Sequence, residues 1–383
     1  MTLASESTRQ VGPPTDAGHD RLQFGIKRPG GPPPFYSELL RRAQAAPMSA
    51  APPAAWLGWL RGLPKAGVSL DEIEWSAVRD WLEMQDGKIR KEAVVSYLTD
   101  AVPEIGTVLL SMAEADEADP SFDGLPRYYV WGPGDGWNHR ELLLVVGNGD
   151  RPPNVPMHRV TTGYKSGHWP DMRNILAHVR TDERKDDDGH RILFVYEIQG
   201  DWPQDWRRAH KAVERAVSEG FDGIVKRMQR AGVLEHGADG RYSYRGRTYD
   251  AQAFRNLLSS LSPAEAAPFM SRVEDVPDAP FIDSTEKWVA LVLKHVIRLA
   301  VDKGIDRIAF IGGQWLCEVT ELTGKAADGS RAFYDRVVPA VAKEVLRKLG
   351  GAPCVPRIDG RKFIGFDITP ALRARVRDGL PLF

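Results

Sequence analysis

The 383-residue sequence has little of several features that identify large classes of protein. It has two cysteines, Cys317 and Cys354, and no Cys-x-x-Cys pair, which excludes a disulfide scaffold and favours a reducing compartment. The formal net charge is −1, so no overall charge attracts the chain to nucleic acid or to an anionic membrane. It has no apolar run of 18 residues and no signal-peptide pattern, so we expect no membrane helix and no membrane partner.

The apolar content of 42% is enough for a sizeable core, and composition divides the chain into parts. Residues 1–34 are rich in Ser, Thr, Gly and Pro, which predicts a disordered tail. Residues 35–112 have apolar side chains at helical spacing, which predicts a small all-helical domain whose simplest role is to dock a partner. Residues 113–126 are acidic and poor in apolar residues, as expected of a linker.

Residues 127–383 mix strand-like and helix-like segments, which predicts an α+β or α/β core with a mixed β-sheet and crossover helices. We expect strands at 140–146, 174–180, 191–199, 306–311 and 362–368, and helices at 284–304 and 331–349. The second and third strands should form a hairpin with a solvated tip at 181–189. The helix before the fourth strand makes a crossover unit, so part of the sheet should be parallel. A polar, irregular insertion is expected at about 203–280, with a helix at 205–219 near its start.

Within this insertion, residues 241–249 alternate like an exposed β-hairpin and interleave basic with aromatic side chains. Such interleaving can contact nucleic acid through phosphates and stacked bases. An ordinary surface hairpin has the same pattern, because the segment is short and belongs to no wider basic stripe.

The third strand has the most informative pattern of the chain. Residues 192–196 are apolar and are followed by Glu197, Gln199 and Asp201. Side chains alternate along a strand, so residues 197 and 199 should share one face. Burying a carboxylate is costly unless it has a partner, a metal or a proton. The sequence therefore predicts a polar site where this strand ends.

One hypothesis for this site is a metal-dependent nuclease of the restriction-endonuclease-like type. Such a core has an acid before one strand and Glu-x-Lys, or a Gln variant, on the next, and the carboxylates hold a divalent cation such as Mg²⁺ or Mn²⁺. The candidate metal ligands are Asp171 and Glu197. The candidate catalytic residues are Glu197, Gln199, Asp201, His168 and Lys294, with His178 as an accessory residue. The candidate substrate-binding residues are Arg180, Lys165 and Trp202.

Two other hypotheses belong to different classes. A group transferase similar to GNAT acyltransferases fits the order of strand 191–199, helix 284–304 and strand 306–311, but no Gly-rich turn opens the helix to hold a pyrophosphate. A non-enzymatic protein, carried in a virion or bound to a host factor, would use the same polar side chains as a structural network. Nucleic acid or a host protein is therefore the expected partner.

Several motifs occur in the order found in a recurrent phage and prophage family. They lie at residues 72–75, 164–169, 175–180, 197–202, 279–281, 304–310, 333–335 and 367–383. Through them, residues 35–383 resemble modules of the large polyvalent proteins of phages and conjugative elements. The resemblance implies a mobile-element origin and a place in the host cytoplasm, with packaging in the virion, but no particular reaction. The chain has Gly200 and Pro203 where the family usually has Ser and His.

Overall fold

The computed structural model describes residues 35–103, 105–111, 136–147, 163–169, 172–260 and 276–383. The expected tail at 1–34, the expected linker at 113–126 and the metal-ligand candidate Asp171 all lie outside these residues. No helix in the described part of the chain is both long enough and apolar enough to cross a membrane.

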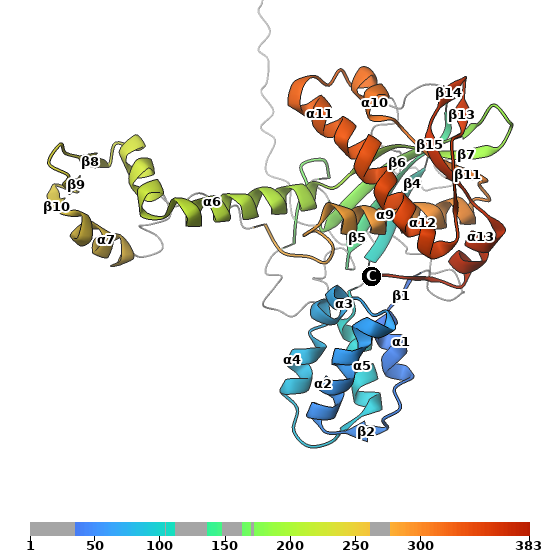
Figure 1. The fold of residues 1–383 in the computed structure, drawn as a ribbon, viewed down its shortest axis with the longest axis horizontal. Coiled ribbons are helices and arrows are strands. Elements are labelled where there is room, and N and C mark those ends of the chain that lie inside the picture. The colour runs from blue at the N-terminus through green and yellow to red at the C-terminus, as the bar shows by residue number, and fades with distance from the viewer. Residues whose placement is uncertain (1–34, 104, 112–135, 148–162, 170–171, 261–275) are drawn as a thin grey trace, which may run out of the picture.

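A seven-stranded β-sheet lies at the centre of the core (Figure 1). Its strands, in spatial order, are β12 (Ala352–Cys354), β15 (Ile364–Asp367), β11 (Arg307–Phe310), β7 (Arg191–Gln199), β6 (Ile175–Lys185), β5 (Trp137–Val146) and β4 (Ile105–Ser111). Strand β11 runs parallel to β7, and every other neighbouring pair is antiparallel. The predicted mixed sheet, with a parallel part, is confirmed.

Three helices share one hydrophobic core with one face of the sheet. They are α9 (Thr285–Asp302), α12 (Val338–Leu349) and α13 (Pro370–Arg377). Helix α9 begins where the hydroxyl of Ser284 accepts the N–H groups of Glu286 and Lys287. It ends before Gly304, which has a φ of +66° that glycine adopts without strain. Because α9 joins the parallel strands β7 and β11, the predicted crossover is confirmed.

The chain between β11 and β12 is helical. Helices α10 (Gly313–Val319) and α11 (Gly324–Ala332) lead into a π-helical turn, Phe333–Val337, and then into α12. Strand β11 ends opposite Val195, so the residues of β7 beyond that point have no neighbouring strand on this side. Tyr334 in the π-helical turn bonds to the backbone of β7 there. Its hydroxyl accepts the N–H of Ile198 at 2.9 Å and lies 3.3 Å from the carbonyl oxygen of the same residue. The short strands β13 (Arg357–Ile358) and β14 (Arg361–Lys362) form a separate pair.

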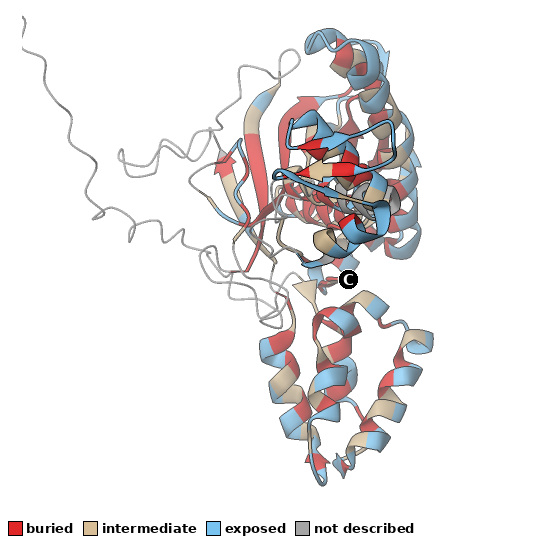
Figure 2. Cartoon of the chain, turned by 90° about the vertical axis from the view of Figure 1, so that its left-hand side faces the viewer, coloured by how far each residue is buried: buried red, intermediate tan, exposed pale blue. Residues whose placement is uncertain are grey.

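The N-terminal helices pack around a core of their own, and their buried and exposed turns alternate (Figure 2). They are α1 (Glu38–Gln44), α2 (Pro53–Gly62), a 3-10 turn (Leu63–Ala66), α3 (Leu70–Trp75), α4 (Val78–Glu83) and α5 (Lys91–Ala101). The unit is not wholly helical, because β2 (Ala50–Ala51) pairs with β3 (Ile89–Arg90). Strand β1 (Phe35–Tyr36) pairs with β16 (Leu380–Pro381). Residues 105–111, expected in the helical domain, instead form the edge strand β4.

The hairpin of β6 and β7 is present, but its tip is shorter than predicted. Strand β6 continues to Lys185, so only residues 186–190 remain for the turn. The solvated tip predicted at 181–189 is wrong in its first half, because Asp182 and Arg184 are buried. They form two hydrogen bonds of 2.8 and 2.7 Å with each other. Charged side chains can be buried in a strand when they are paired in this way.

An arm leaves the sheet directly after β7 (Figure 1). It consists of α6 (Asp201–Arg230), β8 (Leu234–His236), β9 (Tyr242–Tyr244), β10 (Arg247–Tyr249) and α7 (Ala251–Ser260). Helix α6 is kinked at Gly220. The helix predicted at 205–219 is confirmed as part of α6. The rest of the insertion is more regular than predicted as far as residue 260, because a few apolar side chains make a small separate core there. The predicted hairpin is confirmed as β9 and β10, with β8 as a third strand.

Candidate active site at the end of strand β7

A β-bulge turns the end of β7. Arg180 of β6 stands opposite Glu197, but the next residue, Thr181, stands opposite Val195. Tyr196 is therefore an extra residue in β7. Such a bulge reverses the side to which the following side chains point. The polar residues thereby leave the face that packs against α9.

Beyond the bulge, Ile198 belongs to the core beneath α9, while Glu197 and Gln199 stand opposite the polar residues of β6 on the other face. The prediction that residues 197 and 199 share a face is confirmed. Gly200 then leads into α6, and Asp201 is the first residue of this helix. An acid in the first turn is favoured by the helix dipole, so this turn is a stable place for the carboxylate of Asp201.

His168 reaches the same turn from the segment before β6. Asn174 closes the base of this segment, because its side chain accepts the N–H of Tyr164 at 2.9 Å and its own N–H donates to the Tyr164 carbonyl at 2.8 Å. Trp169 is buried in a cluster with residues of β5 and β6. These anchors place Ser166 and His168 beside the start of α6.

The carboxylate of Asp201 is the centre of the group. One of its oxygens lies 2.7 Å from Nδ1 of His168 and accepts a hydrogen bond from the hydroxyl of Ser166. Its other oxygen accepts from Nε2 of Gln199 at 2.7 Å. Burial opposes the negative charge, but these three hydrogen bonds outweigh it and hold the pKa of Asp201 below its usual range. Asp201 is therefore an ionised carboxylate in a fixed orientation.

The His168–Asp201 pair has the geometry of a proton-transfer group. With Nδ1 directed to the carboxylate, Nε2 is the ring nitrogen left to meet a substrate, and the side chain is 46% exposed. A carboxylate in this position fixes the tautomer of an imidazole and stabilises the imidazolium that forms when it takes up a proton. His168 can thus act as a general base or a general acid.

Arg180 lies beside this pair and joins two carboxylates. Its Nε donates to Glu141 at 2.8 Å, and its Nη1 forms an ion pair with Glu197. Burial raises the pKa of Glu197, and the attraction of Arg180 offsets only part of that effect. Glu141 was not a sequence candidate. The one signal for it is an acid at the start of an otherwise apolar stretch of strand.

His178 completes the group beneath the surface. It stands opposite Gln199 in the ladder, and its ring centroid lies 5.9 Å from that of His168. Burial, followed by repulsion from Arg180, lowers the pKa of His178 to about 3, so its ring is neutral near pH 7. We call Ser166, His168, His178, Arg180, Glu197, Gln199 and Asp201, together with Glu141, the polar cluster.

Three candidates from the sequence do not join the polar cluster. Lys165 is exposed and lies in an isolated backbone bridge with Arg173. Trp202 is fully buried and donates its indole N–H to a backbone carbonyl at 2.7 Å, so its ring cannot meet a substrate. Lys294 lies on α9 and donates to the carbonyls of Pro381 and Leu382, at 2.8 and 3.1 Å.

The polar cluster, as far as the structure describes it, does not fit the expected Mg²⁺ or Mn²⁺. A hard cation needs several oxygen atoms directed at it. The carboxylate of Glu197 is bound to the guanidinium of Arg180 instead. Both oxygens of Asp201 already accept hydrogen bonds from the protein. The other expected ligand, Asp171, lies outside the described residues.

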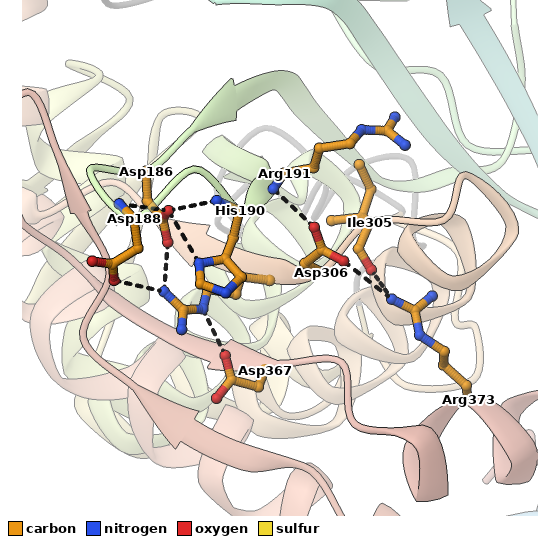
Figure 3. A network of polar contacts seen from close by, with 9 residues as sticks. Asp186, Asp188, His190, Arg191, Ile305, Asp306, Asp367 and Arg373 are labelled. Carbon is orange, nitrogen blue, oxygen red and sulfur yellow. Dashed lines mark hydrogen bonds and ion pairs between the residues drawn. The ribbon is translucent and has the colours of Figure 1, made fainter.

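One other group among the described residues could hold a metal ion. Asp186, Asp188 and His190, at the hairpin tip, bring three ligand atoms within 4.8 Å of one another (Figure 3). Nη1 of Arg307, however, lies 2.5 Å from Asp186 and 3.5 Å from Asp188, and its Nε donates to Asp367 at 2.8 Å. The guanidinium thus supplies the positive charge that a metal ion would bring.

A scan against protein-family models, a search of curated proteins and a search of solved structures each found no match to this chain.

Proposed function

We propose that the polar cluster is the active site of a hydrolase that cleaves nucleic-acid phosphodiesters by general acid–base catalysis. The observation that carries the proposal is the 2.7 Å contact between Nδ1 of His168 and the carboxylate of Asp201, with the imidazole half exposed. In hydrolysis, water forms the new P–O bond while His168 takes its proton. The ester P–O bond then breaks, and the leaving oxygen takes a proton back from the imidazolium.

Nucleic acid is favoured as the substrate by the arm. Residues 221–260, at its end, contain seven Lys or Arg and four Asp or Glu, a formal charge of +3 on a chain whose net charge is −1. The guanidinium of Arg245 lies 5.2 Å from the ring centre of Tyr244, and that of Arg255 lies 4.7 Å from the ring centre of Phe221. Basic side chains bind phosphates through charge, and aromatic rings stack on bases.

Helix α6, the first element of the arm, connects the basic end of the arm to the polar cluster. The helix starts at Asp201 and runs to the kink at Gly220, a length of roughly 30 Å at about 1.5 Å per residue. A nucleic acid held by the basic end of the arm would therefore extend over several nucleotides before it reached His168. The end of the arm would thus supply positive charge for binding phosphates, whereas in the polar cluster the charge of Arg180 is already paired with two carboxylates.

In line with the family resemblance, the protein would come from a phage or another mobile element, be delivered with the virion and act in the host cytoplasm. Asp171, one of the two expected metal ligands, lies outside the described residues. The cleavage assay therefore includes Mg²⁺ and Mn²⁺. The acyltransferase hypothesis has less support. The hydroxyl of Ser284 already accepts the N–H groups of Glu286 and Lys287 at the start of α9, where a pyrophosphate would have to bind.

One observation favours a non-enzymatic binding protein as the second candidate. Arg180 is paired with two carboxylates, and the carboxylate of Asp201 accepts three hydrogen bonds. Polar groups that satisfy one another in this way also occur in networks whose only role is to stabilise a core. Such a protein would dock a host partner, for instance through its N-terminal helices. The two candidates differ in what happens when His168 is changed, because a half-exposed imidazole contributes little to stability.

The test is cleavage of fluorescently labelled single- and double-stranded DNA and RNA, in EDTA, Mg²⁺ or Mn²⁺. We expect His168→Ala to lower the rate by about 100-fold or more, the usual contribution of a general acid or base. His190→Ala, at a similarly exposed histidine outside the polar cluster, serves as the matched control and should cleave like the wild type. The thermal midpoints of both variants should stay within a few degrees of the wild type.

Arm variants separate binding from chemistry. Arg245→Ala with Arg247→Ala should raise KM and leave kcat nearly unchanged, because these side chains lie far from the reacting bond. If the wild type cleaves no substrate in any of the three conditions and Asp201→Asn only lowers the melting temperature, the polar cluster is structural. The search should then turn to protein partners.

A further inference from the structure

A concave site lies on helices α9 and α12, and none of the residues that line it belongs to the polar cluster. It is a cavity of about 430 Å³, within the size range of small-molecule pockets. Its walls are mainly apolar and include Ala290 and Leu291 of α9, Val341 and Val345 of α12, and Phe383. The ring of Phe383 stacks on Phe281 with centroids 4.5 Å apart, which shapes one wall.

Lys294 is the distinctive polar group of this cavity. Its ammonium group has three N–H donors and uses two of them, on the backbone carbonyls of Pro381 and Leu382. Among the described residues, no carboxylate oxygen lies within 4 Å of it, whereas two other lysines that line the cavity have such partners. Lys287 contacts Asp71 and Asp283, and Lys348 contacts Glu344. Lys294 is therefore the one lysine of this cavity whose charge no close carboxylate balances.

The surroundings of Lys294 make that charge costly. Burial, followed by repulsion from Lys348, lowers its pKa to about 8, and the more distant Glu72 offsets only part of this. A partly buried ammonium without a close counter-ion is stabilised by an anion that can reach it. The apolar walls admit such an anion only if the rest of it is also apolar.

We propose that this cavity binds a small amphipathic monocarboxylate, whose carboxylate pairs with Lys294 and whose hydrocarbon body fills the apolar space. A single negative charge fits better than a phosphate dianion, because only one cation is unbalanced and the cavity is also lined by Glu286 and Glu344. The ligand would touch the N-terminal helical unit as well, since Ser69 and Asp71 line the same cavity. Its binding would hold that unit against α9 and α12.

The test is binding of decanoate to the full chain, measured by isothermal titration calorimetry, with decanol as the uncharged ligand of equal chain length. We expect saturable one-to-one binding of decanoate. Lys294→Met keeps the apolar stem but removes the ammonium, and should weaken decanoate binding by about 10- to 100-fold, as expected for a hydrogen bond to a charged group. The same variant should bind decanol with wild-type affinity. Lys348→Met, at an exposed lysine of the same cavity, should change the Kd for decanoate less than twofold.

A pocket-filling variant tests the location. Ala290→Phe should weaken both ligands, because the added ring occupies the cavity. The proposal is refuted if the wild type binds neither ligand saturably, or if Lys294→Met binds decanoate as well as the wild type does. If Lys294→Met does not fold, the pH dependence of decanoate binding to the wild type shows whether the charge of Lys294 holds the ligand. The affinity for decanoate should fall as the pH rises through about 8, where free Lys294 loses its proton, and a flat profile overturns the proposal.

Discussion

Replacement of Arg180 by methionine should destabilise the protein far more than the loss of an ordinary surface ion pair. The guanidinium joins Glu141, whose side chain is 1% exposed, to Glu197, whose side chain is 23% exposed. Removal of one partner from a buried ion pair costs about 3–5 kcal/mol, because a carboxylate remains in a site of low polarity. Most of this loss should come from Glu141, since water can still reach Glu197. The matched control is Arg298→Met, whose 2.8 Å pair with a half-exposed Asp302 should be worth under about 1 kcal/mol.

The pH dependence of the part of this loss that comes from Glu197 tests its electrostatic cause. Burial already raises the pKa of Glu197, and removal of Arg180 should raise it further, since Arg180 is the main group that lowers it. A carboxyl whose folded-state pKa lies above its unfolded value favours the folded state increasingly as the pH falls. Urea unfolding at pH 8, 7, 6 and 5 should therefore show the deficit of Arg180→Met shrinking toward acid. A deficit that stays constant over this range would refute the electrostatic reasoning.

A triple variant gives an independent check on the same argument. Arg180→Met together with Glu141→Gln and Glu197→Gln removes the guanidinium and both negative charges. The side-chain shapes change little, so most of the lost unfolding free energy should return. If the triple variant is no more stable than Arg180→Met alone, packing rather than charge accounts for the loss.

Three further changes follow from buried or closely packed groups. Burial lowers the pKa of His295 to about 3, so the unfolding free energy should fall below pH 6.5 by up to about 1.4 kcal/mol per pH unit from this residue, and His295→Leu should remove that part of the slope in urea titrations. Arg307→Met should create a Mn²⁺- or Ca²⁺-dependent thermal shift at the Asp186 group that the wild type lacks; equal shifts in both proteins would contradict this. Gly365→Ala would place Cβ 2.4 Å from a backbone oxygen of the neighbouring strand and should lower the melting temperature by several degrees, whereas Gly58→Ala, with open space around it, should not.

Local patterns predicted the regular parts of the core well. The hydroxyl of Ser284 and the positive-φ Gly304 bound α9 as their residue types predict, and the crossover to β11 follows from chain direction. The end of β6 was missed because Asp182 and Arg184 look like loop residues in sequence. They lie in a strand because each satisfies the other in the interior. In the arm, the helix and the hairpin were predicted, but their packing into a separate core was missed, since the few apolar residues form a core only when they meet in space.

The candidate site was likewise predicted only in part. The alternation of a strand placed Glu197 and Gln199 on one face, but the bulge at Tyr196 decided that this face lies away from α9. Lys294, which was predicted as a catalytic residue of this site, lines the cavity on α9 and α12 instead. No spacing in the sequence indicates that Glu141 would meet Arg180, because that contact depends on strand register.

The sequence by itself determined the central strands and the crossover helix of the core, that the sheet is mixed, and that acid and amide side chains follow the buried part of β7. These properties depend on the periods of hydrophobic residues and on capping groups, which act within a few residues of each other. Only the tertiary structure decided that the carboxylate of Asp201 holds His168, that Arg180 neutralises Glu197, and that Lys294 lines a separate cavity. Those contacts join residues distant in the chain, and their energies depend on the burial and partners that folding alone provides.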